Sequence, residues 1–356
     1  MVYILLFTFF VLLSFLTQVK LPKEFNALVF ILINIVLIAF VGLRGDIDPD
    51  YSNYLNIFTD TEYGYSNNRD IEFGYYIFNR LVLYMGWSFQ VVIFTMAVLS
   101  IVGKTYFFAR YSPNFGLSIL IYFCTLFFLF DFIAIRQAVA LSAFMISLPF
   151  IYQRRIWPFL AIMLLASQIH VSSVLLIPGY FLFHRNFSKF TLLGIIAVCA
   201  VLNIMKVVVP LVEYGLSLLP IPGGSAEKVA IYLAENEYAF VSVKQILLGC
   251  LFVLLKFKIK EKDELLNILV NLFVFGILFG TLFNGLPQLA YRMKWYFFWT
   301  ESVLVVYLVN YISAQNLRLT YLLYALLIFI YGYSLFTFLN DVASRGAYIF
   351  PYQFFF

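Results

Sequence analysis

Long apolar segments alternate with short polar turns along nearly the whole chain. Because a helix needs about 20 mostly apolar residues to cross a bilayer, segments of this kind predict membrane-spanning helices. They lie at residues 2–19, 25–43, 88–108, 116–133, 137–153, 190–208, 242–257, 265–283, 295–312 and 320–339. The pattern therefore predicts an all-α, polytopic integral membrane protein.

Residues 156–184 form an apolar stretch with basic residues at both ends. Arg154–Arg155 precede it and Arg185 follows it, and basic residues near spans favour the cytoplasmic side. Two short helices that break near Gln168–His170 place both ends on that side, as a spanning or re-entrant hairpin. With this hairpin we expect about 12 spanning helices, within a range of roughly 10 to 14.

The remaining segments fit a single transmembrane domain that covers residues 1–356. Two longer loops, at about 44–72 and 209–241, separate predicted spans, and the sequence shows no soluble catalytic domain or repeat. Residues 73–86 are apolar but too short to span a bilayer, so we expect an interfacial helix there.

The composition excludes a soluble globular protein. Hydrophobic residues make up 63% of the chain and charged residues only 12%, whereas soluble domains carry about 25% charged residues. Tyr and Phe are frequent, as expected where many helix ends lie at membrane interfaces. Cys124, Cys199 and Cys250 each lie in an apolar segment, which indicates small buried residues rather than a disulfide framework or a zinc site.

The basic residues predict the orientation of the chain in the membrane. More than half of the 23 Lys and Arg residues, with Lys104 and Arg110 counted, fall near turns on one side, which we assign to the cytoplasm. The opposite side then holds most acidic residues, both long loops and both termini. We therefore expect the chemistry of this protein on the extracytoplasmic side.

Four distant parts of the sequence bring cationic or titratable groups to the outer ends of predicted helices. Charge at membrane depth is costly, so such groups usually face a cavity or a partner. They are Arg44, Arg136 with the adjacent Gln137, His170, and Arg292 with Lys294. The first outer loop adds the acidic residues Asp46, Asp48, Asp50, Asp70 and Glu72.

Each of these residues also has a structural explanation. An arginine at a helix end often extends to the lipid headgroups, and Arg136 could form a structural ion pair with Asp131. A lone histidine in a membrane helix is more often a hydrogen-bonded core residue than a catalyst. The spacing of Asp46, Asp48 and Asp50 could suit a divalent metal, but a solvated acidic loop is the stronger interpretation.

Five sequence blocks, in order, carry a family resemblance. They are Leu43-Arg44-Gly45 through Asp50-Tyr51-Ser52-Asn53-Tyr54 to Phe58; Glu72-Phe73-Gly74-Tyr75; Ile135-Arg136-Gln137-Ala138-Val139-Ala140; Leu164-Leu165-Ala166 followed by Ile169-His170-Val171-Ser172-Ser173; and Tyr291-Arg292 with Tyr296-Phe297. Their order and spacing over about residues 40–310 resemble the EpsG-like branch of the Wzy-type polysaccharide polymerases.

This resemblance implies a GT-C-like membrane glycosyltransferase of the bacterial cytoplasmic membrane, independent of metals and other cofactors. It implies an undecaprenyl-diphosphate-linked oligosaccharide as substrate. The growing glycan would move from its lipid carrier to the non-reducing end of the next lipid-linked repeat, at the extracytoplasmic face. A flippase and a chain-length regulator are expected partners beside the bilayer, and nucleic acid is not.

The residues of these blocks suit that reaction. Arg44, Arg136 and Arg292 are expected to bind the diphosphate, because the guanidinium fork binds phosphate oxygens bidentately and stays ionised. His170, together with Arg136, is expected to be catalytic, as a base or as the group that orients the acceptor hydroxyl. Weaker candidates for sugar or acceptor binding are Asp50, Tyr54, Glu72 and Gln137.

Three other functions remain open from the sequence. An O-antigen ligase-type transferase shares the donor and differs in the acceptor. A membrane acyltransferase also uses an intramembrane histidine, but would act on a cytoplasmic acyl donor. A lipid-linked glycan flippase would place cations along a central cavity, and Glu301 is the residue that best fits such a transporter.

Overall fold

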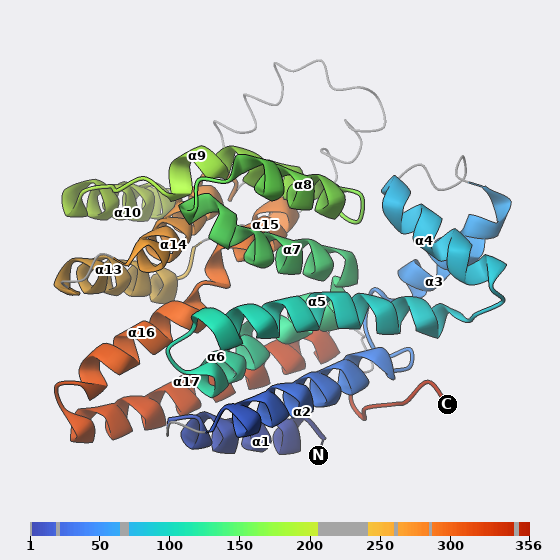
Figure 1. The fold of residues 1–356 in the computed structure, drawn as a ribbon, viewed down its shortest axis with the longest axis horizontal. Coiled ribbons are helices and arrows are strands. Elements are labelled where there is room, and N and C mark those ends of the chain that lie inside the picture. Colours follow the sequence, from blue (N-terminus) through green and yellow to red (C-terminus); the bar gives the residue numbers. More distant parts are fainter. Residues whose placement is uncertain are drawn as a thin grey trace. The chain divides into compact units, whose positions relative to one another are not determined.

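The computed structural model describes residues 2–18, 22–64, 71–205, 241–259, 263–284, 287–344 and 349–356, with residues 287–289 and 291–292 described by their backbone alone. Within these ranges the chain is helical, apart from turns, bends and an isolated antiparallel bridge between Arg44 and Phe354. The chain divides into two compact units, Met1–Tyr180 with Val305–Phe356, and Phe181–Leu304. The fold is that of an all-α, multi-pass membrane protein (Figure 1).

The first unit contains most of the long helices. Its helices are α1 (Val2–Leu16), α2 (Lys23–Gly42), α3 (Tyr51–Asp60), the 3-10 turn η1 (Thr61–Tyr63), α4 (Phe73–Tyr84), α5 (Phe89–Tyr111), α6 (Phe115–Tyr122), the π-helix η3 (Phe123–Ile133), α7 (Ile135–Tyr152), α8 (Ile156–Ser167), the 3-10 helix η4 (Val171–Gly179) and α17 (Leu317–Ser344). The short α9 (Tyr180–Phe183) and α16 (Glu301–Ser313) contain the boundaries between the units.

Helix α5 organises the packing of the first unit, since it contacts both α2 and α7 (Figure 1). Helix α1 packs against α6, α8 packs against α7, and α17 packs against η3. In the second unit, α14 (Glu264–Leu282) contacts α10 (Lys189–Met205), α13 (Val243–Lys258) and α15 (Pro287–Phe298). Residues of α14 are buried on all sides, as expected for a helix surrounded by three others.

Six helices among the described residues are long and apolar enough to cross a membrane: α2, α5, α6 continued by η3, α7, α14 and α17. Four more apolar helical segments are shorter, so the expected number of spans is not confirmed. The single span expected at 295–312 is wrong, because α15 ends at Phe298 and α16 begins at Glu301. The buried Thr300 lies between them, and its hydroxyl donates to the carbonyl of Phe297.

The predicted break near Gln168–His170 is confirmed, because α8 ends at Ser167 and η4 begins at Val171. A helix within 73–86 is confirmed as α4. The loop expected at 44–72 contains α3 and η1 in its described part, and the loop expected at 209–241 lies outside the described residues except for Val241.

Asp131, in η3, is the centre of a buried polar cluster. Its Oδ1 accepts hydrogen bonds from Lys104 Nζ and Ser100 Oγ, both at 2.6 Å, and its Oδ2 accepts one from the Tyr122 hydroxyl at 2.6 Å. The alternative that Arg136 forms a structural ion pair with Asp131 is therefore wrong, because a lysine from α5 pairs with this carboxylate. Lys104 is buried rather than near a cytoplasmic turn, so it does not support the predicted orientation.

Candidate functional site

Glu72 joins two of the residues that the sequence predicts to be functional. Its Oε2 accepts a hydrogen bond from Arg136 Nη1 at 2.5 Å, and its Oε1 lies 3.1 Å from His170 Nδ1. The backbone N–H of Val171 also donates to Oε1, at 2.9 Å. The three side chains come from sequence positions 72, 136 and 170, so the fold brings together three of the five blocks named above.

Each residue of this trio lies at the end of a helical element. Glu72 is the N-cap of α4, Arg136 is the second residue of α7, and His170 precedes η4 in an extended conformation. Helix ends place polar groups where the backbone changes direction, next to unsatisfied backbone N–H groups. One such group, that of Val171, is satisfied by the Glu72 carboxylate.

The start of α4 is held directly against the break between α8 and η4. The backbone N–H of Tyr75 donates to the carbonyl of Gln168 at 3.0 Å. A Cβ at Gly74 would lie 2.6 Å from Gln168 Cβ and 2.7 Å from its carbonyl oxygen. Glycine is therefore required at this position for the two segments to approach closely enough for Glu72 to reach His170.

The trio is partly accessible, which distinguishes it from the buried pairs Arg44–Asp48 and Lys104–Asp131. The side chains of Glu72, Arg136 and His170 are 12%, 18% and 23% exposed. Burial by itself would raise the pKa of Glu72, but the hydrogen bond with His170, the charge of Arg136 and the Val171 N–H outweigh it and lower this pKa to about 2. Glu72 is therefore a carboxylate at any pH near neutrality.

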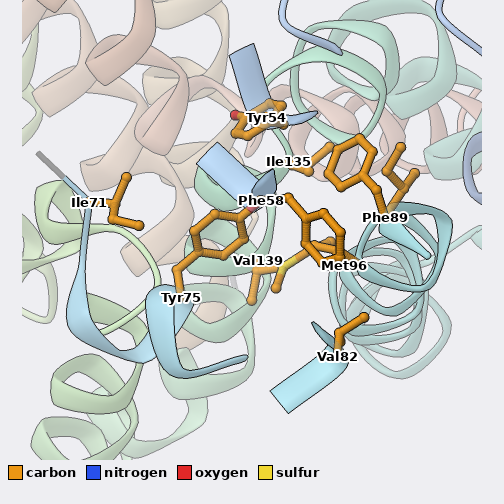
Figure 2. Packing of buried hydrophobic residues seen from close by; sticks show 11 residues of the cluster. Tyr54, Phe58, Ile71, Tyr75, Val82, Phe89, Met96, Ile135 and Val139 are labelled. Carbon is orange, nitrogen blue, oxygen red and sulfur yellow. The ribbon is translucent and has the colours of Figure 1, made fainter. Parts of the chain in front are cut away.

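Arg136 packs against two neighbouring tyrosine rings. Its guanidinium carbon lies 5.7 Å from the ring centre of Tyr54 and 5.4 Å from that of Tyr75. Both rings belong to the buried cluster in Figure 2, which joins α3, α4, α5 and α7. Such packing fixes the direction of the guanidinium and adds cation–π attraction. The Nε atom of Arg136 is buried without a hydrogen-bond partner in the described structure.

The same packing bears on the sugar-binding role expected of Tyr54. Tyr54 is only 7% exposed and Tyr75 is completely buried, so their rings support Arg136 rather than line an open surface. Gln137, which follows Arg136, is also buried. Asp50 is half-buried at the N-cap of α3, and its backbone N–H donates to Asp48 Oδ1.

Arg44 occupies a different environment from Arg136. It is fully buried, its Nε donates to Asp48 at 2.9 Å, and its guanidinium lies over the ring of Phe132. The loop after α2 pairs with the C-terminal segment, through Gly45 N–H to the Gln353 carbonyl at 2.9 Å. The structure therefore does not present Arg44 to a ligand, and its expected role in diphosphate binding stays a prediction.

The remaining expected residues lie in the second unit. Arg292 and Lys294 are both in α15, where the backbone of Arg292 is described and Lys294 is buried. Glu301 accepts a hydrogen bond from Lys244 Nζ at 2.8 Å, so the residue that best fits a transporter is part of an ion pair. Within the described part of the chain, no group of three or more His, Cys, Asp or Glu residues is arranged to hold a metal ion.

The profile of the EpsG family matches residues 26–354, which is most of the chain and includes every residue of the trio. The chain belongs to the EpsG family. No curated protein and no solved structure matched it. Membership of this family suggests a polysaccharide polymerase of the glycosyltransferase kind, in agreement with the expectation drawn from the sequence blocks.

In this EpsG-family protein, the observed geometry offers three chemical capabilities in one place. Arg136 supplies a fixed, partly exposed cation, His170 supplies a ring nitrogen that can take or give a proton, and Glu72 connects them. From the sequence alone, Glu72 is only one of the weaker candidates for sugar or acceptor binding. The local sequence around Glu72, two residues before Gly74, marks it as part of a family block. It does not reveal the partners Arg136 and His170, which are 64 and 98 residues away.

Proposed function

We propose that this EpsG-family protein polymerises undecaprenyl-diphosphate-linked oligosaccharide repeats at the extracytoplasmic face of a bacterial cytoplasmic membrane. The growing glycan moves from its lipid carrier to a hydroxyl at the non-reducing end of the next lipid-linked repeat. The observation that carries the proposal is the meeting of Arg136 and His170 on one carboxylate, within the residues matched by the family.

The reaction needs a cation for the leaving group. As the bond between the sugar and the phosphate breaks, negative charge develops on the lipid diphosphate. Arg136 is suited to this charge because it stays ionised and because tyrosine rings and Glu72 hold its orientation before the reaction starts. Its side chain is 18% exposed, so part of it is accessible to a phosphate oxygen.

The reaction also needs a group that accepts the proton of the acceptor hydroxyl. His170 lies close to Arg136 through their shared partner Glu72, so a base and a leaving-group cation are available in one site. Arg292 lies inside the matched residues and remains a proposed second contact for the diphosphate.

The test is the size distribution of lipid-linked and surface glycan in cells that lack the gene and carry wild-type protein, Arg136→Ala or His170→Ala. We expect a polymer ladder with the wild type and single repeat units at the outer surface with either variant. Matched controls are His184→Ala, at the second of the two histidines, and Arg155→Ala, at an exposed arginine; both should keep the ladder.

The other functions give different results in the same experiment. Repeats that accumulate on the inner leaflet would indicate a flippase, and full-length chains that fail to reach their final acceptor would indicate a ligase. A normal ladder that lacks only an acyl group would refute glycosyl transfer.

A further inference from the structure

We propose that Glu72 is the positioning residue that holds the proton of His170 on Nδ1, so that Nε2 is the atom that takes the proton of the acceptor hydroxyl. This inference rests on the proposed function and specifies how its base is prepared. Glu72 itself does not need to contact the substrate.

The hydrogen bonds around Glu72 determine which nitrogen carries the proton. An ionised carboxylate has only acceptor sites, and Glu72 Oε1 lies 3.1 Å from His170 Nδ1. A hydrogen bond at this distance therefore requires the proton on Nδ1. In neutral imidazole the other nitrogen, Nε2, then has the free lone pair that a general base needs.

The two other contacts of Glu72 keep it in this state. The hydrogen bond from Arg136 to Oε2 and the N–H of Val171 on Oε1 both favour the ionised form, in agreement with a pKa of about 2. Because Glu72 is much more acidic than an imidazolium, it stabilises the charge of His170 without taking its proton.

The net charge of the trio also changes in step with the charge of the leaving diphosphate. With His170 neutral, Arg136 and Glu72 cancel. When the acceptor oxygen bonds to the anomeric carbon, its proton passes to Nε2, and the electron pair of the breaking carbon–oxygen bond leaves with the lipid diphosphate. The site then carries one net positive charge as the diphosphate gains one negative charge, and the imidazolium later returns its proton to the diphosphate or to water.

A purely structural role for Glu72 makes a different prediction. Glu72 also links α4 to the break before η4, so its removal could simply loosen this region. Glu72→Gln keeps the shape and, with its amide oxygen in the Oε2 position, still accepts from Arg136. Its NH₂ group then takes the Oε1 position, where it gives up the bond from Val171 and donates to Nδ1, which moves the ring proton to Nε2 and removes the base.

The experiment uses membranes of a deletion strain that contain accumulated lipid-linked repeat, with added full-length wild type, Glu72→Gln, Glu72→Asp, His170→Ala or the Glu72→Gln/His170→Ala pair. Elongation rate is measured against repeat concentration. We expect Glu72→Gln to lower the maximal rate about 100-fold or more while the half-saturating concentration changes less than about 3-fold, by analogy with other carboxylates that fix a histidine tautomer. Glu72→Asp should recover part of the rate.

The double variant is the decisive comparison. If Glu72 acts through His170, adding Glu72→Gln to His170→Ala causes no further loss, because residues that act as a unit are not additive. The inference would be overturned if the losses of the two single variants multiply in the double variant. A Glu72→Gln rate within about 3-fold of wild type, or a loss of rate explained by a smaller amount of folded protein, would also overturn it. If the wild type itself elongates nothing, the proposed function fails first, and that result is distinct from the others.

Discussion

Removal of the charge on Asp131 should destabilise this protein through the lysine that it leaves behind. Asp131 and Lys104 are 0% and 1% exposed at their side chains, and the carboxylate accepts three hydrogen bonds. Asp131→Asn keeps the size and most of the hydrogen-bonding atoms but leaves a buried ammonium group without its counter-charge. Breaking a buried pair on one side costs about 3–5 kcal/mol, so we expect a loss of at least about 3 kcal/mol.

The second partner provides the internal control. Lys104→Met alone leaves the carboxylate uncompensated, whereas Lys104→Met with Asp131→Asn removes both charges. Because a buried pair contributes little net free energy compared with an apolar replacement, the double variant should recover at least about 2 kcal/mol relative to Asp131→Asn. The measurement is the free energy of unfolding of the full-length protein in detergent, from SDS titration followed by tryptophan fluorescence.

A double variant that is as unstable as the sum of the single variants would refute this reasoning. It would mean that Lys104 and Asp131 act independently, through packing around η3 rather than through their charges. A loss below about 1 kcal/mol for Asp131→Asn would also refute it, since this is the range of exposed ion pairs.

Three other results are expected. The stabilisation that Glu72 contributes is measured as the difference in unfolding free energy between wild type and Glu72→Gln in detergent. It should be complete above pH 4.5 and should be lost as the pH falls towards about 2, because folding lowers the pKa of Glu72. A difference that is unchanged at about pH 3 would contradict this. Gly74→Ala should lower polymerisation by pushing α4 away from Gln168, whereas Gly194→Ala, where a Cβ meets nothing within 4 Å, should be neutral. Removal of residues 349–356 should speed proteolysis of the loop after α2, measured by limited digestion, because their backbone hydrogen bonds are lost.

The helices were the part of the structure that the sequence pattern predicted best. Apolar length and flanking charge placed α2, α5 and α14 within a few residues of their observed limits, and the two basic clusters around 156–184 predicted the break before His170. These features are local, so they can be seen in a single stretch of sequence. The break at Thr300 was not predicted, although the polar residues Thr300, Glu301 and Ser302 interrupt the apolar run there.

The site was predicted only in part, because its contacts join distant residues. Arg136 and His170 were recognised from their own segments, but nothing local identifies Glu72 as their common partner. The same limitation applies to Asp131, for which proximity in sequence offers Arg136 as one alternative partner, whereas the fold supplies Lys104. Arg44 and Arg136 look alike as helix-end arginines, and only the packing shows that Asp48 neutralises the former in a buried position.

The π-helix η3 has a consequence for how Arg136 is aimed. An α-helix turns the chain by about 100° per residue, and the wider π-helix turns it by less. The eleven residues of η3 end at Ile133, and Ala134, whose backbone is not helical, joins them to Ile135, one residue before Arg136. The turns of η3 and the bend at Ala134 together place the start of α7, so an insertion or deletion within η3 would displace Arg136 from Glu72 without changing any residue of the trio. The length of η3 is therefore as important for the geometry of the site as the three side chains of the trio.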